Sequence, residues 1–165
     1  MKKLQLTPML LLLLLLLSCS NDNSNYRLLA TEKTLPENFH EVSFQRKSGA
    51  AFQYLLTKVT EVEAFEKEWD YFGFQGNAPN TDFQEKSVVF IELQESGSCP
   101  YKLKEITIDK AKKTITVPFS DPKGNCTADA TSRTFVLELE NEMIRDIEKL
   151  VIVQSGYTTE MPFTN

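Results

Sequence analysis

Short runs of strand-forming residues fill the second half of this chain, and they constrain its fold more than any other feature. The runs "SVVFIEL" and "KLVIVQS" are apolar on both faces, which is typical of strands in the middle of a sheet. "TITVPFS" and "RTFVLELE" alternate apolar and polar residues, as half-buried strands do. "YKLKEITID" shifts its apolar phase midway, which indicates a bulge. These five runs lie at residues 87–93, 149–155, 114–120, 133–140 and 101–109.

A β-hairpin is expected ahead of these strands. Residues 40–46 and 51–59 are both rich in strand-forming residues, and Gly49 lies between them. Further along, Pro118 cannot donate a backbone hydrogen bond, so we expect its strand at a sheet edge. With about seven antiparallel strands and short connections, the pattern predicts a mainly β fold, either a β-sandwich or a partly closed barrel.

A single amphipathic helix is expected between the hairpin and the later strands. Thr60 and Glu63 have the spacing of a capping box, and apolar residues then recur at helical spacing until Gly73. We expect this helix over residues 61–72. Its apolar stripe predicts that it packs across one end of the β structure.

The N-terminus has the order of a secretory signal sequence. Two lysines precede an apolar run from Leu4 to Leu17, and small residues follow it. A permanent membrane-spanning helix is a poorer interpretation, because this run has 14 residues and about 20 are needed to cross the hydrocarbon core. We therefore expect residues 1–18 to direct export.

Residues Leu16, Leu17, Ser18 and Cys19 resemble the lipobox of bacterial lipoproteins. The resemblance implies a diacylglyceryl group on the Cys19 sulfur, cleavage between Ser18 and Cys19, and anchoring in a membrane by the acyl chains. Ser20 after the cysteine resembles lipoproteins that are sent on to an outer membrane. The alternative is an ordinary secreted protein in which this cysteine has no role.

After the leader, we expect a tether and one domain. Residues 19–38 should form a lipidated cysteine and a flexible tether, because "SNDNSN" has no apolar residue to bury. Residues 39–165 suffice for a single domain. Of the 18 basic residues, two lie in the leader, which leaves 16 against 23 acidic residues and argues against nucleic-acid binding. No cofactor or metal is expected, since the sequence has no phosphate-binding glycine loop and no zinc-ligand spacing.

The chain has three cysteines, and lipidation of Cys19 leaves Cys99 and Cys126 to pair. If the two strands between these cysteines form a hairpin around Ala111, the cysteines come within disulfide reach. We expect the bond because exported proteins retain disulfides. A metal or redox pair is the weaker alternative, since there is no C-x-x-C motif and no histidine close by.

No catalytic constellation is evident in the sequence. The one histidine, His40, has no nucleophile motif with it, and we expect an ordinary strand or surface residue. The densest aromatic cluster surrounds the end of the expected helix. Tyr71 and Phe74 fall outside its buried stripe there, so they are candidates for binding a partner. Tyr101, in the loop that follows Cys99, is a third candidate.

The order of elements from residue 53 onward resembles the PrcB-like family of envelope lipoproteins. The resemblance covers roughly residues 53 to 140 and rests on the "TEVEAFEKEW" helix, "DF" at Asp82 and Phe83, the "KSVVFI" strand and a G-x-x-x-Y turn from Gly97 to Tyr101. At this turn the family tends to have "GGY", whereas this chain has "SCPY". The resemblance implies a small β-rich accessory domain that supports a surface protease complex.

These features together predict a lipid-anchored protein of the bacterial cell envelope that binds a protein partner and is not an enzyme. Lipid on Cys19 would hold it at a membrane, which we expect to be the outer membrane. The first alternative is an inhibitor of an extracellular protease that presents the loops 94–101 and 120–132. A hydrolase ranks last, because the single histidine leaves it no obvious machinery.

Overall fold

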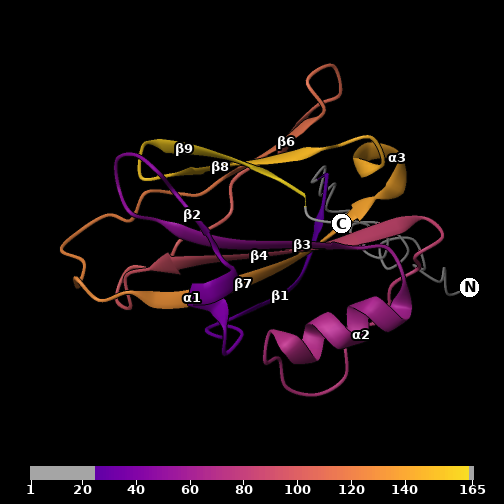
Figure 1. The fold of residues 1–165 in the computed structure, drawn as a ribbon, viewed down its shortest axis with the longest axis horizontal. Coiled ribbons are helices and arrows are strands. Elements are labelled where there is room, and N and C mark those ends of the chain that lie inside the picture. Colours follow the sequence, from indigo (N-terminus) through magenta and orange to yellow (C-terminus); the bar gives the residue numbers. More distant parts are fainter. Residues whose placement is uncertain (1–24, 164–165) are drawn as a thin grey trace, which may run out of the picture.

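The computed structural model describes residues 25–163, which form two β-sheets stacked face to face (Figure 1). These residues contain nine strands and three helices, of which only one helix exceeds a single turn. The prediction of a mainly β fold is confirmed, and its form is a sandwich, since neither sheet closes into a barrel within the described residues. The described residues hold two strands more than the seven predicted, one in the expected tether and one after residue 155, where no strand was predicted.

The larger sheet has five antiparallel strands in the order β1-β7-β4-β3-β2. They are β1 (Arg27–Glu32), β2 (Phe44–Gln45), β3 (Gln53–Val59), β4 (Lys86–Glu95) and β7 (Thr131–Glu140). As predicted, the run that begins at Ser87 forms a central strand, β4, which is buried on both faces. β1 is an outer strand, and its pairing with β7 shifts register between Leu28 and Ala30.

The smaller sheet has four strands in the order β5-β6-β8-β9. They are β5 (Thr107–Asp109), β6 (Thr114–Pro118), β8 (Lys149–Gln154) and β9 (Tyr157–Pro162). β6 lies inside this sheet and pairs in parallel with β8, so the prediction of an edge strand from Pro118 is wrong. Proline is tolerated because β5 begins only at Thr107, opposite Thr116, so the β5–β6 ladder does not extend to Pro118.

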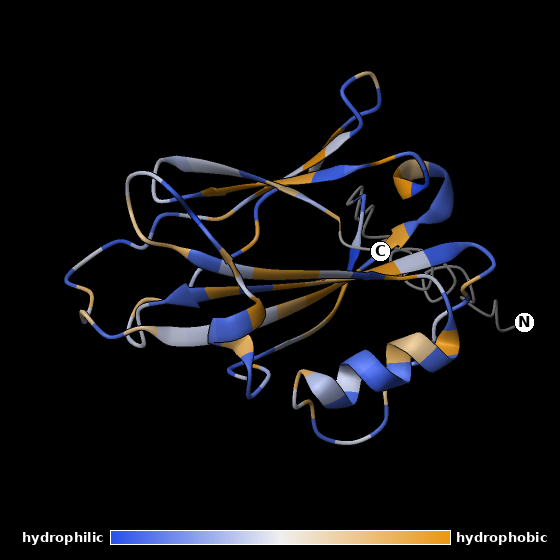
Figure 2. Ribbon diagram, viewed as in Figure 1, coloured by the Kyte–Doolittle hydropathy of each residue, from blue (hydrophilic) through white to orange (hydrophobic). Residues whose placement is uncertain are grey.

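The main core lies between the sheets and is built from their facing side chains. On β4 these are Val89, Ile91 and Leu93, which pack in one cluster with Ile115 of β6 and Ile152 of β8. Burial of each such side chain stabilises the fold by about 1.5–3 kcal/mol. Figure 2 shows the hydrophobic colour along the middle of β3 and β4, whereas α2 alternates hydrophobic and hydrophilic residues.

Helix α2 (Val62–Tyr71) covers the opposite face of the larger sheet (Figure 1). Its Phe65 and Trp69 pack against Phe90 of β4 in a second core cluster. The predicted helix is confirmed to within one residue at each end. Its predicted position across an end of the β structure is wrong, because β4 is apolar on both faces and its outer face also needs a cover. The expected capping box does not form, since the N-cap residue is Glu61 and makes no side-chain capping bond.

Residues 25–38 belong to the domain, although we expected a flexible tether as far as residue 38. "RLLATE" forms β1, whose partner strand β7 lies 111 residues away at the Arg27–Glu138 contact. The chain then crosses the outer face of the larger sheet, where Pro36 and Phe39 are buried. Thr134 Oγ1 of β7 donates to the Thr34 carbonyl at 2.9 Å and holds this segment in place.

Two other predicted strands are shorter than expected. The hairpin at residues 40–46 and 51–59 forms, but residues 39–42 make the single-turn helix α1 and only the two residues of β2 pair with β3. The turn of α1 buries Phe39, which is 0% exposed. Of the expected strand 101–109 only β5 pairs continuously, and Leu103 makes an isolated bridge to Phe119.

Candidate functional site: a groove beside the first strand

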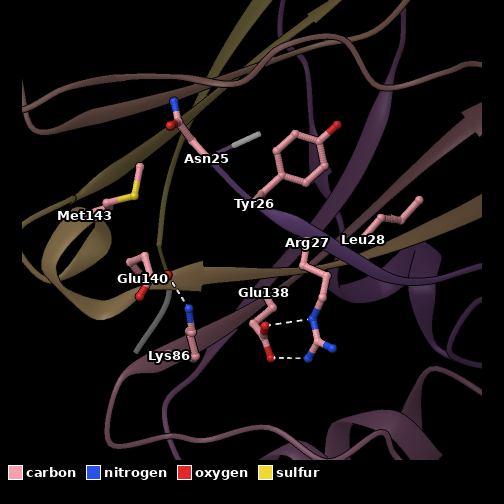
Figure 3. Close-up of a pocket in the computed structure, with 8 residues that line it drawn as sticks. All are labelled: Asn25, Tyr26, Arg27, Leu28, Lys86, Glu138, Glu140 and Met143. Carbon is pink, nitrogen blue, oxygen red and sulfur yellow. Dashed lines mark hydrogen bonds and ion pairs between the residues drawn. The ribbon is translucent and has the colours of Figure 1, made fainter. Parts of the chain in front are cut away.

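A groove of about 760 Å³ opens beside the start of β1. Figure 3 shows its lining, which comes from β1, the flanking Asn25 and Tyr26, β4, β7 and helix α3 (Asn141–Ile144). The lining residues are Asn25, Tyr26, Arg27, Leu28, Lys86, Glu138, Glu140 and Met143. We call this site the β1 groove.

Two ion pairs form the polar part of the β1 groove. Arg27 Nε and Nη2 donate to the two carboxylate oxygens of Glu138, at 2.8 and 2.7 Å. Beside them, Lys86 Nζ donates to Glu140 Oε1. Strand register produces both pairs, because Arg27 lies opposite Glu138 and Lys86 lies opposite Glu140. The hydrogen bond from Arg27 to Glu138 raises the pKa of Arg27, which keeps the guanidinium charged.

The rest of the β1 groove is apolar or aromatic. Leu28 is 43% exposed, and Met143 of α3 lies across the groove from it. Partial burial raises the pKa of the Tyr26 phenol, which therefore stays protonated at neutral pH. The eight lining residues include no histidine, cysteine, serine or threonine, so none of the Ser–His, Thr or Cys–His nucleophile arrangements can be built from them. With its charges paired, the groove suits a partner that offers apolar and hydrogen-bonding groups.

Two of the aromatic residues that we considered for partner binding lie near the end of α2. Tyr71 is 39% exposed, and its hydroxyl donates to Asn38 Oδ1 at 2.7 Å. Phe74 is 5% exposed and stacks on Trp69 with ring centroids 4.3 Å apart. The prediction of Phe74 as a partner-binding residue is therefore wrong. The chain reverses at Gly73, which has φ of +76°, and this turn brings Phe74 back onto the helix.

Tyr101, the third aromatic candidate, lies at a different place in the fold. It packs against the core between the sheets, whereas Tyr71 belongs to the helix that covers the outer face. The Tyr101 hydroxyl is 2.7 Å from Ser155 Oγ, and its N–H donates to Glu95 Oε2 at 2.8 Å. The three aromatic candidates therefore do not form one site.

The predicted disulfide joins Cys99 and Cys126, whose Cα atoms are 5.5 Å apart. The β5–β6 hairpin turns near Ala111, as expected, and this brings the two cysteine loops to the same end of the fold. Hydrogen bonds reinforce the link, since the Thr127 N–H donates to Ser98 Oγ at 2.9 Å. The loops around Cys99 and Cys126 are thus cross-linked to each other and exposed to solvent.

His40, the one histidine of the chain, lies apart from these sites. His40 is an exposed residue of α1, and its Nδ1 is 3.0 Å from Gln53 Oε1. Cys19, the predicted lipid attachment residue, lies outside the described residues.

A buried carboxyl group lies on the outer face of β4. Glu92 is 0% exposed and is flanked by Leu55 of β3 and Thr134 of β7. Neither of its carboxyl oxygens has a hydrogen-bond partner among the described residues. Burial raises the Glu92 pKa to about 8, and the Ser132 hydroxyl offsets this effect only in part. Glu92 is therefore mostly protonated at neutral pH.

No family model, curated protein or solved structure matches this chain. The resemblance to the PrcB-like family thus stays a prediction. In the part of the chain that the structure describes, no helix is long and apolar enough to cross a membrane. Between residues 25 and 163, no group of three or more His, Cys, Asp or Glu side chains is placed to hold a metal ion.

The sequence prediction missed the β1 groove because it assigned residues 25–38 to the tether. The local signal was weak, since only Tyr26 and Thr31 of "YRLLATE" are strand-forming residues. The pairing of Arg27 with Glu138 gave no local signal, because it depends on the register of two strands that are distant in sequence. Glu92 was also missed, since its neighbours along the chain only indicate a buried strand.

Proposed function

We propose that this protein is a lipid-anchored, non-enzymatic binding module of the bacterial cell envelope, and that the β1 groove receives a protein partner. The observation that carries the proposal is the location of the groove at the first described residues of the domain. Asn25 lines it and is only six residues beyond Cys19 in the sequence. Six extended residues reach roughly 20 Å, so a lipidated Cys19 would keep the groove close to the membrane surface.

The composition of the β1 groove supports a protein partner. Leu28 and Met143 offer apolar contact. The Arg27 side chain, which pairs with Glu138, is 60% exposed and offers its planar guanidinium. Arginine and exposed apolar side chains are typical of protein interfaces. A subunit that supports an envelope or surface protease complex, as the resemblance implies, is one partner of this kind.

Lipid attachment is tested by metabolic labelling of cells with an alkyne analogue of palmitate. We expect the label on the wild-type protein and none on Cys19→Ser, which should also keep residues 1–18 and migrate as the larger precursor. The double variant Cys99→Ser with Cys126→Ser is the matched control, because it removes two cysteines and should still be labelled. Labelling of Cys19→Ser at the wild-type level would show that this residue is not the attachment site.

Partner binding is tested by placing a photo-crosslinking amino acid at Leu28 in the full chain and irradiating intact cells. We expect one reproducible crosslinked protein, because Leu28 is exposed within the groove. The control is the same amino acid at exposed Lys67, on helix α2 and outside the groove. Identical crosslinks from both positions, or none from Leu28, would argue against the groove as the docking surface.

A second function, inhibition of an extracellular protease, is favoured by one observation on the loop 121–125. Both of its ends are fixed, since Ser120 N–H donates to the Lys102 carbonyl at 2.8 Å and Cys126 is held by the disulfide. Lys123 is exposed at its centre. If this loop inhibits a protease that cleaves after lysine, trypsin should be slowed by the wild-type protein and not by Lys123→Ala. Unchanged trypsin turnover with both proteins would count against this function.

A further inference from the structure

A cluster of unpaired polar groups lies between the sheets, at the end where the β2–β3 and β8–β9 hairpins meet (Figure 1). Tyr54 of β3, Gln154 of β8 and Thr159 of β9 are 0%, 1% and 4% exposed. The Tyr54 hydroxyl, the Gln154 Oε1 and the Thr159 hydroxyl have no hydrogen-bond partner among the described residues. A buried polar atom without a partner costs about 1–3 kcal/mol, so three in one place need an explanation.

These groups come from strands that bring them together. Gln154 and Thr159 lie on neighbouring strands, since Gln154 pairs with Tyr157 and Thr159 pairs with Ile152. The Thr159 hydroxyl is near enough to Tyr54 to lower the pKa of its phenol. The Gln154 Nε2 donates to the Gln94 carbonyl at 3.0 Å, which fixes the amide and leaves Oε1 as a free acceptor.

Arg46 supplies a cation beside this cluster. Its guanidinium lies over the Tyr157 ring, with Cζ 4.6 Å from the ring centroid, and its Nη1 is buried without a hydrogen-bond partner. The charge of Arg46 also acts on the Tyr54 hydroxyl. Among residues 25–163, Arg46 has no carboxylate partner.

The turn of the β2–β3 hairpin is shaped around this arginine. Gly49 has φ of +78°, and a Cβ added there would lie 2.8 Å from Arg46 Nη1 and 3.1 Å from the Tyr157 ring. Phe52 packs beside it, with its ring centroid 5.9 Å from that of Tyr157. The hairpin turn therefore packs closely around one cation and two aromatic rings.

We propose that this hairpin end binds a small carboxylate that carries a hydrogen-bond donor next to its carboxyl group. Arg46, Tyr54 and Thr159 each offer a donor, and the cation selects an anion. The Gln154 Oε1 would accept the ligand's own donor, which distinguishes this ligand from a plain fatty acid. Entry requires the Arg46 side chain to move off the Tyr157 ring. Two sources have this chemistry, a free hydroxy acid and the last residue of a peptide.

Binding is tested by NMR on the full chain in detergent, with 13C-labelled tyrosines and the Tyr54 signal assigned from Tyr54→Phe. Lactate represents the free hydroxy acid and N-acetylalanine represents the peptide terminus. We expect a saturable shift of the Tyr54 and Tyr157 signals with one or both. Propionate, which lacks the donor, should bind more weakly, and neutral lactamide should cause no shift. A shift with lactate alone identifies a hydroxy acid as the ligand, and a shift with N-acetylalanine alone identifies a peptide terminus.

Variants separate this site from general anion binding. Loss of the charged hydrogen bond in Arg46→Gln should weaken binding by roughly tenfold or more. The matched control is Lys47→Gln, because it removes an exposed cation next to Arg46 and should leave the affinity unchanged. Thr159→Val keeps the shape of the side chain and should also weaken binding. The proposal is overturned if neither acid causes a saturable shift, as for a site that takes water only, or if Arg46→Gln binds as well as wild type.

Discussion

Replacing Glu92 with glutamine should remove most of the dependence of stability on pH between 5 and 8. The side chain is 0% exposed on the central strand β4. Its pKa is about 8 in the folded protein, against an ordinary value of 4.5. Between these pH values the folded protein holds a proton that the unfolded chain releases. The free energy of unfolding therefore falls as pH rises, and the stability present below pH 4.5 is progressively lost up to pH 8.

The size of this effect follows from the two pKa values. One pKa unit corresponds to about 1.4 kcal/mol, so wild type should lose about 3 kcal/mol of unfolding free energy from pH 5 to pH 8 through Glu92. Glutamine has nearly the same shape and cannot ionise. At pH 5, where Glu92 is protonated, the free energy of unfolding of Glu92→Gln should match that of wild type to within about 1 kcal/mol. At pH 8 it should exceed the wild-type value by about 3 kcal/mol.

The assay is urea unfolding, monitored by the fluorescence of Trp69. This is the one tryptophan, and its side chain packs in the core between α2 and the larger sheet. Midpoints and slopes are compared at several pH values, and equal slopes confirm that only stability changed. Glu142→Gln is the control, because Glu142 is an exposed carboxylate on α3. If the difference between wild type and Glu92→Gln does not grow from pH 5 to pH 8, the Glu92 carboxyl is not protonated in the fold.

Two further predictions concern the disulfide and the β1 groove. The double variant Cys99→Ser with Cys126→Ser should lose roughly 3–4 kcal/mol of stability, the chain-entropy value for a link with a sequence separation of 27. Calorimetry should show that a reductant lowers the melting temperature of wild type and leaves that of the double variant unchanged. Arg27→Ala should cost roughly 1–3 kcal/mol, because it leaves the nearly buried Glu138 carboxylate without its partner. Adding Glu138→Gln should recover part of this loss in urea unfolding, and no recovery would indicate that Arg27 acts through packing alone.

The local residue pattern was sufficient to predict those strands and helices that can be recognised without knowing what they pair with. β4 and β8 are two-sided apolar runs, and α2 has a regular helical stripe, so each could be recognised from its own residues. The Cys99–Cys126 bond was also predictable, because the β5–β6 hairpin that aligns it is a local structure.

Elements that depend on distant partners could not be predicted in this way. β1 follows a polar run, and its stability comes from β7, more than 100 residues further along the chain. The position of β6 inside its sheet depends on parallel pairing with β8, which no local feature of "TITVPFS" indicates. The candidate sites share this property. Arg27 and Glu138 meet through sheet register, and Arg46 meets Tyr157 only where two hairpins come together.

The shifted register of β1 also affects how copies of this protein meet. β1 is an outer strand of the larger sheet, and such a strand exposes backbone groups that another molecule could pair with. The irregularity between Leu28 and Ala30 interrupts the regular spacing of those groups after two residues. A second chain laid along this edge would lose register almost at once. Growth of a shared sheet through the β1 edge is therefore disfavoured.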